Sequence, residues 1–231
     1  MRECSSFRER ITILKYESVP VNKVRRDKKP AMKDAFAKWT ANLRIEKYNT
    51  RESYKKGVPD EIQTVEGNTA TTKGLFILWN LAMGLGPADE TTAEYEGSTI
   101  TGIYPLNSDN TYIAVGNGTQ PASASDTELY AQETGENIQD YYYKKCDDYY
   151  PIVDSNNNTT LQVRATFEPT EANFAWNEWG VANGDMSNIS SPRTADNVVL
   201  FNRRQESMGT KGDEATWVII ADLIISPAVS S

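Results

Sequence analysis

The sequence predicts a mainly β protein: a β-sandwich-like domain of residues 59–231 that follows a basic N-terminal arm of residues 1–58. Twelve tyrosines, with many threonines and asparagines, favour strands and hydrogen-bonding surface over helical bundles. From Ala93 onward, short apolar runs alternate with Gly, Asn, Asp and Ser, a pattern typical of sandwiches and barrels. A chain of 231 residues with 39% hydrophobic content can bury a substantial core.

The N-terminal arm begins with a strand-like run, Ile11–Tyr16, and continues into a basic stretch that ends at Pro30. Pro30 would suit the first turn of a helix. Apolar residues then recur at helical spacing, at Met32, Ala35, Phe36, Trp39 and Leu43. We therefore expect a short amphipathic helix that docks on another surface.

Two strands are expected next, at Leu43–Tyr48 and Glu61–Glu66, with Gly57 and Pro59 breaking the chain between them. A helix is expected at about residues 71–84, where Thr71 or Thr72 can cap it. One of its faces carries Leu75, Leu78, Trp79 and Ala82, and the other face carries Phe76 and Ile77. Since both faces are apolar, we expect this helix to be buried against a sheet.

Three further segments are predicted strands. In Thr111–Gly116, Tyr112, Ala114 and Gly116 alternate with Ile113 and Val115. In Leu161–Phe167, apolar and polar residues alternate strictly, which gives one buried and one solvated face. The last run, Trp217–Ile225, is apolar on both faces, so we expect a central strand.

Charge divides the chain unevenly. Residues 1–56 hold 16 Lys and Arg against 7 Asp and Glu, a net +9, whereas residues 57–231 hold 8 against 25, a net −17. A basic arm on an acidic body could bind nucleic acid, an anionic surface or the acidic body of a neighbouring copy. The neighbouring copy is favoured, because head-to-tail contact between copies would be electrostatically complementary. Nucleic acid is disfavoured because the basic cluster lacks interleaved stacking aromatics. The alternative interpretation is that the basic arm is a solvated charged face that binds no partner.

Enzymatic and metal chemistry are not expected. The chain has no histidine, which removes the usual general base and the commonest transition-metal ligand. Cys4 and Cys146 are too far apart in the chain for a CxxC site, so we expect free or buried thiols, with a disulfide between them left open. No cofactor is expected. Residues 1–10 are charged and no long apolar run follows, so we expect no secretory signal and no membrane span.

Two motifs resemble sites on first inspection. The segment Val115–Pro121 (VGNGTQP) looks like a phosphate-binding glycine loop, but Pro121 stands where a third glycine is needed, so a turn is expected. Glu178 lies between Trp176 and Trp179, as in a sugar-cleaving site, yet such a site needs a second, opposed carboxylate. In a regular strand Trp176 and Glu178 would share one face and Trp179 the other. A buried tryptophan cluster is the favoured alternative.

A tyrosine cluster precedes the predicted strand at 161–167. It comprises Tyr141, Tyr142, Tyr143, Tyr149 and Tyr150. Exposed tyrosines are common at protein and sugar interfaces, whereas about half of the tyrosines in strands belong to cores.

The order of several segments resembles phage virion proteins described as minor structural or tail proteins, and more distantly the phage tail-collar fibre family. These segments lie at residues 66–84, 111–129, 161–181, 200–211 and 215–226. Ala114–Gly118 is similar to the first element of the collar family, Asp126–Leu129 to the second and Asn177–Val181 to the third. The resemblance spans roughly residues 60–226.

The resemblance implies a non-enzymatic structural component of a tailed-phage virion, in a tail, collar or neck and fibre-attachment position. Its partners would be other virion proteins and copies of itself in a homo-oligomer, after synthesis in the host cytoplasm. Two alternatives are a capsid decoration or head-fibre protein, and a host-glycan-binding module that uses Trp176, Trp179 or the tyrosines. The expected contact residues are Lys23, Arg25, Arg26, Lys28, Lys29, Phe36, Trp39, Tyr141, Tyr142 and Tyr143.

Overall fold

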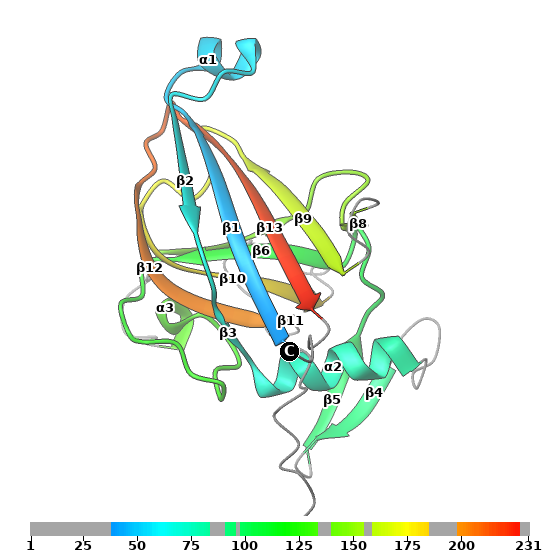
Figure 1. Cartoon of the computed structure of the whole chain (residues 1–231). Helices are drawn as coiled ribbons and strands as arrows, with labels where there is room; N and C mark the ends of the chain where they lie inside the picture. The colour runs from blue at the N-terminus through cyan, green and yellow to red at the C-terminus, as the bar shows by residue number, and fades with distance from the viewer. Residues whose placement is uncertain are drawn as a thin grey trace, which may run out of the picture. The chain divides into compact units, whose positions relative to one another are not determined.

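Two antiparallel sheets face each other, as the alternating sequence pattern predicted (Figure 1). The computed structural model describes residues 38–83, 91–95, 98–133, 140–154, 159–184 and 198–226. The first sheet has the order β2 (Glu61–Val65), β1 (Lys38–Tyr48), β13 (Thr216–Ser226), β9 (Thr160–Phe167) and β8 (Ile152–Val153). β13 is therefore an interior strand, as its two apolar faces indicated.

The second sheet runs across the first, as Figure 1 shows. Its order is β3 (Thr69–Ala70), β12 (Asn202–Thr210), β10 (Ala175–Gly184), β6 (Thr111–Gly116) and β7 (Tyr141–Lys145), and β11 (Val198–Leu200) also pairs with β10. A separate hairpin joins β4 (Thr91–Tyr95) to β5 (Ser98–Ile103). In the part of the chain that the structure describes, the helices are α1 (Arg51–Lys56), α2 (Thr72–Met83) and α3 (Tyr130–Glu133). Among the described residues, no helix is long and apolar enough to cross a membrane.

β1 corrects the expected arm. It pairs with β13 along its whole length, from Lys38 opposite Ser226 to Tyr48 opposite Thr216. The predicted amphipathic helix is therefore wrong from Lys38 onward. A spacing of four residues, as between Trp39 and Leu43, puts two side chains on one face of a strand as well as of a helix. The backbone pairing with β13 decides between the two.

The boundary between arm and body also lies earlier in the chain than residue 58. The compact unit that contains both sheets begins at Phe36, so residues 38–58 belong to the β domain. Beyond β1, Thr50 caps the short helix α1, and Gly57 ends it in a left-handed conformation with φ 65°. The basic cluster at residues 23–29 and Phe36 lie outside the described residues.

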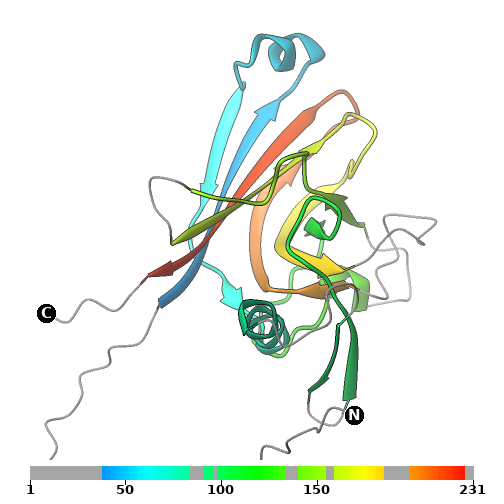
Figure 2. The same cartoon turned by 90° about the vertical axis from the view of Figure 1, so that its right-hand side faces the viewer.

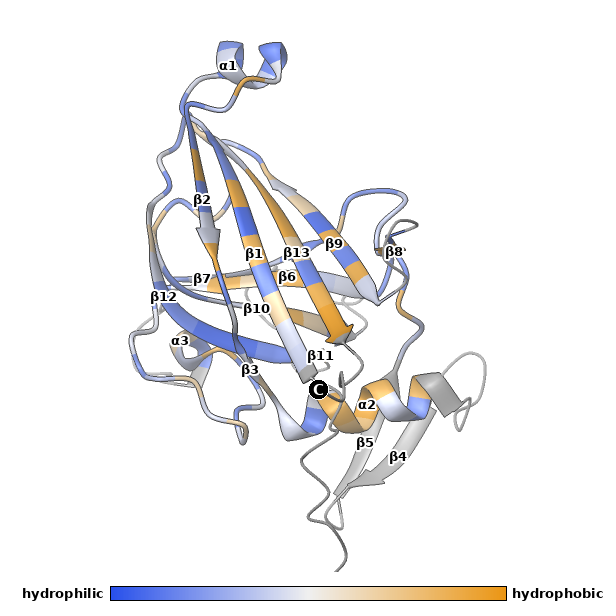
Figure 3. Cartoon of the chain, in the orientation of Figure 1, coloured by the Kyte–Doolittle hydropathy of each residue, from blue (hydrophilic) through white to orange (hydrophobic). Residues whose placement is uncertain are grey.

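The core lies between the two sheets. Hydrophobic and hydrophilic residues alternate along β1 and β9 (Figure 3), and the inward side chains in the middle of both strands are fully or almost fully buried. Leu43 and Ile45 of β1 and Val163, Ala165 and Phe167 of β9 belong to this core. The ring of Trp176 packs edge-on against Phe167 at 4.8 Å and Trp217 at 4.7 Å, measured between ring centres.

The faces of β10 differ from those predicted. The pairing of β10 with β12 shifts register where Trp176 pairs with Gly209 and Glu178 with Gln205, so the extra residues lie on β12. Trp176 and Trp179 both belong to the hydrophobic core cluster. Both indoles therefore lie in the core between the sheets, and Glu178 lies on the opposite face. The expectation that Trp176 and Glu178 share a face was wrong because an irregularity in strand pairing leaves no simple trace in residue spacing.

The predicted helix at 71–84 is confirmed as α2, which is seen end-on beside the two sheets in Figure 2. Thr71 caps it as expected, because its Oγ1 accepts from the backbone N of Gly74 at 2.9 Å. A Cβ on Gly74 would lie 2.4 Å from Cα of Phe201, so glycine permits the close approach of helix and sheet. Ile77 is fully buried, but Trp79 is 66% exposed, so the helix is only partly covered.

Candidate functional site

Glu178, the residue that suggested sugar cleavage, is 0% exposed and lies under the loop that joins β6 to α3. Its carboxylate accepts from three backbone nitrogens: Gly118 at 3.2 Å, Tyr130 at 3.0 Å and Ala131 at 2.8 Å. It also accepts from Nε of Arg203 at 2.7 Å. All four donors come from this chain, so the carboxylate is fully engaged.

The glycines of the VGNGTQP segment let the backbone approach this carboxylate closely. A Cβ on Gly118 would lie 2.4 Å from Oε1 of Glu178, and one on Gly116 would lie 2.6 Å from the same atom. Only glycine allows the backbone to approach an oxygen this closely. The loop that resembled a phosphate-binding motif therefore surrounds an anion, but the anion is the side chain of Glu178.

Arg203 extends the network to Asp126. Its guanidinium is almost fully buried and donates to Oδ2 of Asp126 at 2.9 Å and to the carbonyl oxygens of Gln120 at 3.0 Å and Pro121 at 3.3 Å. Burial alone would lower the pKa of Arg203, but the hydrogen bond to Asp126 and the charge of Glu178 outweigh it and raise that pKa. We call Glu178, Arg203 and Asp126 the Glu178 clamp.

The clamp fixes the loop between β6 and α3 to the second sheet. Its two carboxylates bind the same arginine, which stands between them, instead of facing each other across an open space. A glycoside hydrolase needs two carboxyl groups on opposite sides of a substrate. The geometry of the clamp therefore suits structural support, with each of the three guanidinium nitrogens donating to an acceptor of this chain.

The aromatic residues considered for sugar binding are mostly internal. The indoles of Trp176 and Trp179 are buried in the core. Tyr143 is buried and donates to Oε1 of Gln132 at 2.9 Å, and burial raises the pKa of its hydroxyl. Tyr142 and Tyr141 are half-buried, against Phe167 and Tyr143 respectively. The expected contact surface of Tyr141–Tyr143 is therefore largely covered within the chain.

Two lysines are buried in different settings. Nζ of Lys47 lies 2.7 Å from Oε1 of Glu61 and 4.9 Å from the centre of the Trp217 ring, which gives it an ion pair and a cation–π contact. Nζ of Lys211 donates to the backbone oxygen of Glu168 at 2.7 Å and to Oδ1 of Asn173 at 2.9 Å. Burial lowers the pKa of Lys211 to about 8. Both lysines are used to tie segments of the chain together.

Within the described ranges, no group of three or more His, Cys, Asp or Glu side chains could hold a metal ion. Cys146 is a free, buried thiol, and burial raises its pKa to about 12. At neutral pH this thiol is therefore protonated and a poor nucleophile. Cys4 lies outside the described residues.

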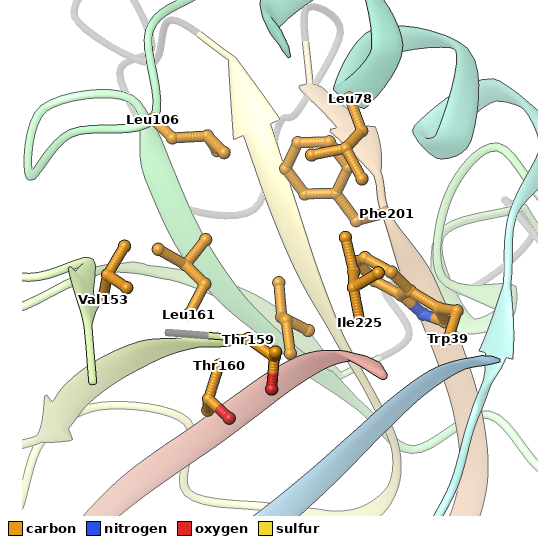
Figure 4. A pocket seen from close by; sticks show the side chains of 10 residues that line it. Trp39, Leu78, Leu106, Val153, Thr159, Thr160, Leu161, Phe201 and Ile225 are labelled. Carbon is orange, nitrogen blue, oxygen red and sulfur yellow. The ribbon is translucent and has the colours of Figure 1, made fainter. Parts of the chain in front are cut away.

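Sequence reasoning missed a cavity of about 330 Å³ at one end of the sandwich, which we call the Trp39 cavity (Figure 4). Side chains from the first sheet, from α2, from the segment before β6 and from Phe201 between β11 and β12 line the same space (Figure 4). The lining residues are Trp39, Leu78, Leu106, Val153, Thr159, Thr160, Leu161, Phe201, Leu223 and Ile225. The apolar lining residues look like ordinary core residues in the sequence, and Thr159 and Thr160 follow a polar run, so spacing gave no signal of a cavity.

The cavity is apolar and is lined by both buried and exposed residues. Phe201 and Leu223 are buried, whereas Val153 is 58% and Ile225 44% exposed. Trp39, which we expected on a docking helix, contributes its ring from β1 instead. The lining contains no Asp, Glu, Lys or Arg, so the space is suited to an uncharged group.

In comparisons with known proteins, no family model matches this chain, and no curated protein or solved structure matches it. The fold and the two regions described above therefore provide the basis for functional inference, together with the order of sequence motifs.

Proposed function

We propose that this chain is a non-enzymatic structural component of a tailed-phage virion and acts through protein–protein assembly. The position proposed is the tail, collar or neck and fibre attachment, with synthesis in the host cytoplasm before incorporation. The order of the motifs across residues 60–226, three of which are similar to tail-collar elements, supports this assignment.

The non-enzymatic part of the proposal rests on the hydrogen bonds that the Glu178 carboxylate accepts within this chain. Its four donors come from this chain, and its carboxylate is closed off from solvent. A general acid must reach the leaving-group oxygen of a substrate, and a nucleophile must reach its anomeric carbon. Glu178 can do neither without breaking the clamp that holds its loop.

Assembly is supported by two further features. Trp79 on α2 is 66% exposed, and Tyr149 is 91% exposed, and these residue types dominate the energetic centres of protein interfaces. The charge difference, +9 over residues 1–56 and −17 over residues 57–231, would favour contact between unlike parts of neighbouring copies.

Mass spectrometry of density-purified virions whose genome encodes this chain tests the proposal. We expect the chain to be present in several copies per particle and to stay bound through high-salt washing. A chain found in infected cells but absent from washed particles would overturn the assignment. Immunogold labelling of the same particles distinguishes the tail from the head surface, and labelling confined to the head would favour the decoration-protein alternative.

Light scattering tests the assembly mechanism on the purified chain. We expect a homo-oligomer that dissociates when Trp79 is changed to Ser, because the loss of a central aromatic anchor typically costs about 2 kcal/mol or more of binding free energy. Val58→Ser, at another exposed apolar residue, is the matched control. A chain that stays monomeric at all concentrations would contradict self-association.

A further inference from the structure

The Trp39 cavity has a different character from the surface that assembly would use. Its floor residues Phe201 and Leu223 are buried, and its apolar rim residues Val153 and Ile225 are exposed. A protein interface of ordinary size covers about 800 Å² on each partner. Here the apolar area is gathered into a recess, which is the form of a site for a small molecule.

The volume sets the size of the occupant. A cavity of about 150 Å³ lined by aliphatic and aromatic side chains stays dry and binds benzene. The Trp39 cavity, at about 330 Å³, has roughly twice that volume. It can therefore hold a fused pair of rings or a medium-length hydrocarbon chain.

The lining sets the chemistry of the occupant. Thr159 and Thr160 are the polar residues of the lining, and all other lining side chains are aliphatic or aromatic. A charged group placed here would lose its hydration without gaining an ion pair.

We propose that the Trp39 cavity is a binding site for a small, uncharged hydrophobic molecule, with its hydrocarbon part between the two sheets and its more polar end at the Val153 and Ile225 rim. This site is separate from the Glu178 clamp and does not depend on the proposed virion function.

The test uses the full chain and the neutral dye N-phenylnaphthylamine, whose fluorescence rises in apolar surroundings. We expect saturable binding with one dye per chain, and displacement of the dye by decanol. The variant Val153→Trp should block the mouth and weaken dye binding by about tenfold or more. Val153 is at the rim and exposed, so this change leaves the core intact.

Ile152→Trp is the matched control. Ile152 is the neighbour of Val153 on β8, is 41% exposed and is not part of the lining, and adjacent residues of a strand point to opposite faces. We expect its dye affinity to stay within about twofold of the wild type. Ile225→Trp, on the other side of the mouth, should act like Val153→Trp.

Three outcomes would overturn the proposal. One is the absence of saturable dye binding by the folded wild-type chain. Another is wild-type affinity in both Val153→Trp and Ile225→Trp. The third is a change of oligomeric state in these two variants without dye binding by the wild type, which would make the cavity a contact between protein chains. Melting curves of all variants confirm that each is folded.

Discussion

The Glu178 clamp and the Trp39 cavity are two interior regions with opposite physical character. In the clamp, buried charges meet partners of the same chain at hydrogen-bonding distance. In the cavity, apolar side chains surround a space that none of them fills. The residues that attract attention in a sequence, a carboxylate between two tryptophans, are used for structure. The residues that look like ordinary core form the recess that can receive a ligand.

The largest loss of stability is expected from Glu178→Gln, which breaks the Glu178 clamp. It removes the charge that faces Arg203 and leaves that guanidinium buried with only Asp126 as an ionic partner. We expect the free energy of unfolding to fall by about 3 kcal/mol, measured by urea denaturation. Glu206→Gln, in the partly exposed pair with Arg204, is the control and should cost less than about 1 kcal/mol. Equal stabilities of the two variants would mean that the clamp does not support the fold.

A smaller loss is expected from Gly118→Ala, because the new Cβ would lie 2.4 Å from Oε1 of Glu178 and 3.0 Å from the backbone N of Ala131. The carboxylate and the loop cannot both keep their positions, so we expect a loss of about 1–3 kcal/mol in the same assay. Gly212→Ala has no atom within 4 Å of its Cβ and should be close to neutral. A neutral Gly118→Ala would show that the loop is not held against Glu178.

Local residue patterns predicted some strands correctly and others incorrectly. The two-residue alternation of Leu161–Phe167 predicted a strand with one buried face, and β9 has that pattern, because strand periodicity is a local property. The spacing of Trp39 and Leu43 fitted a helix and a strand equally, and only the pairing with β13 resolved it. The pairing of β10 with β12 is irregular between Trp176 and Glu178, and Trp176 shares the core with Trp179 instead of a face with Glu178.

The clamp and the cavity could not be predicted because both depend on contacts between distant parts of the chain. Arg203 is 25 residues from Glu178 and 77 from Asp126 in sequence. The lining of the cavity comes from segments between Trp39 and Ile225. A single sequence shows which side chains are apolar or charged, but not which of them meet, nor where packing leaves a space.

Filling the Trp39 cavity should raise the free energy of unfolding, whereas breaking the Glu178 clamp should lower it. Leu161→Phe, from β9, places a larger side chain into the space and suits a strand. We expect it to raise the free energy of unfolding by about 0.5–2 kcal/mol and to lower the affinity for the neutral dye. Gln162→Phe, the adjacent residue on the opposite face of β9, is the control and should leave dye binding unchanged. A destabilised Leu161→Phe that still binds dye would mean that the space is not where its side chain points.

The smallest effect at neutral pH is expected for Lys211→Met, because the change removes two hydrogen bonds but also removes the cost of a buried charge. The folded-state pKa of Lys211, about 8, lies below its ordinary value of 10.5, so the unfolded chain binds the proton more tightly. Wild-type stability should therefore gain from this residue as the pH rises from about 8 to 10.5, and the methionine variant should lack that gain. Urea denaturation of both proteins across this range measures the difference, which should widen in favour of the wild type. Parallel profiles would mean that Lys211 has the same pKa in the folded and the unfolded chain. The environment of Lys211 would then not shift its protonation, in contrast to the tightly paired charges of the Glu178 clamp.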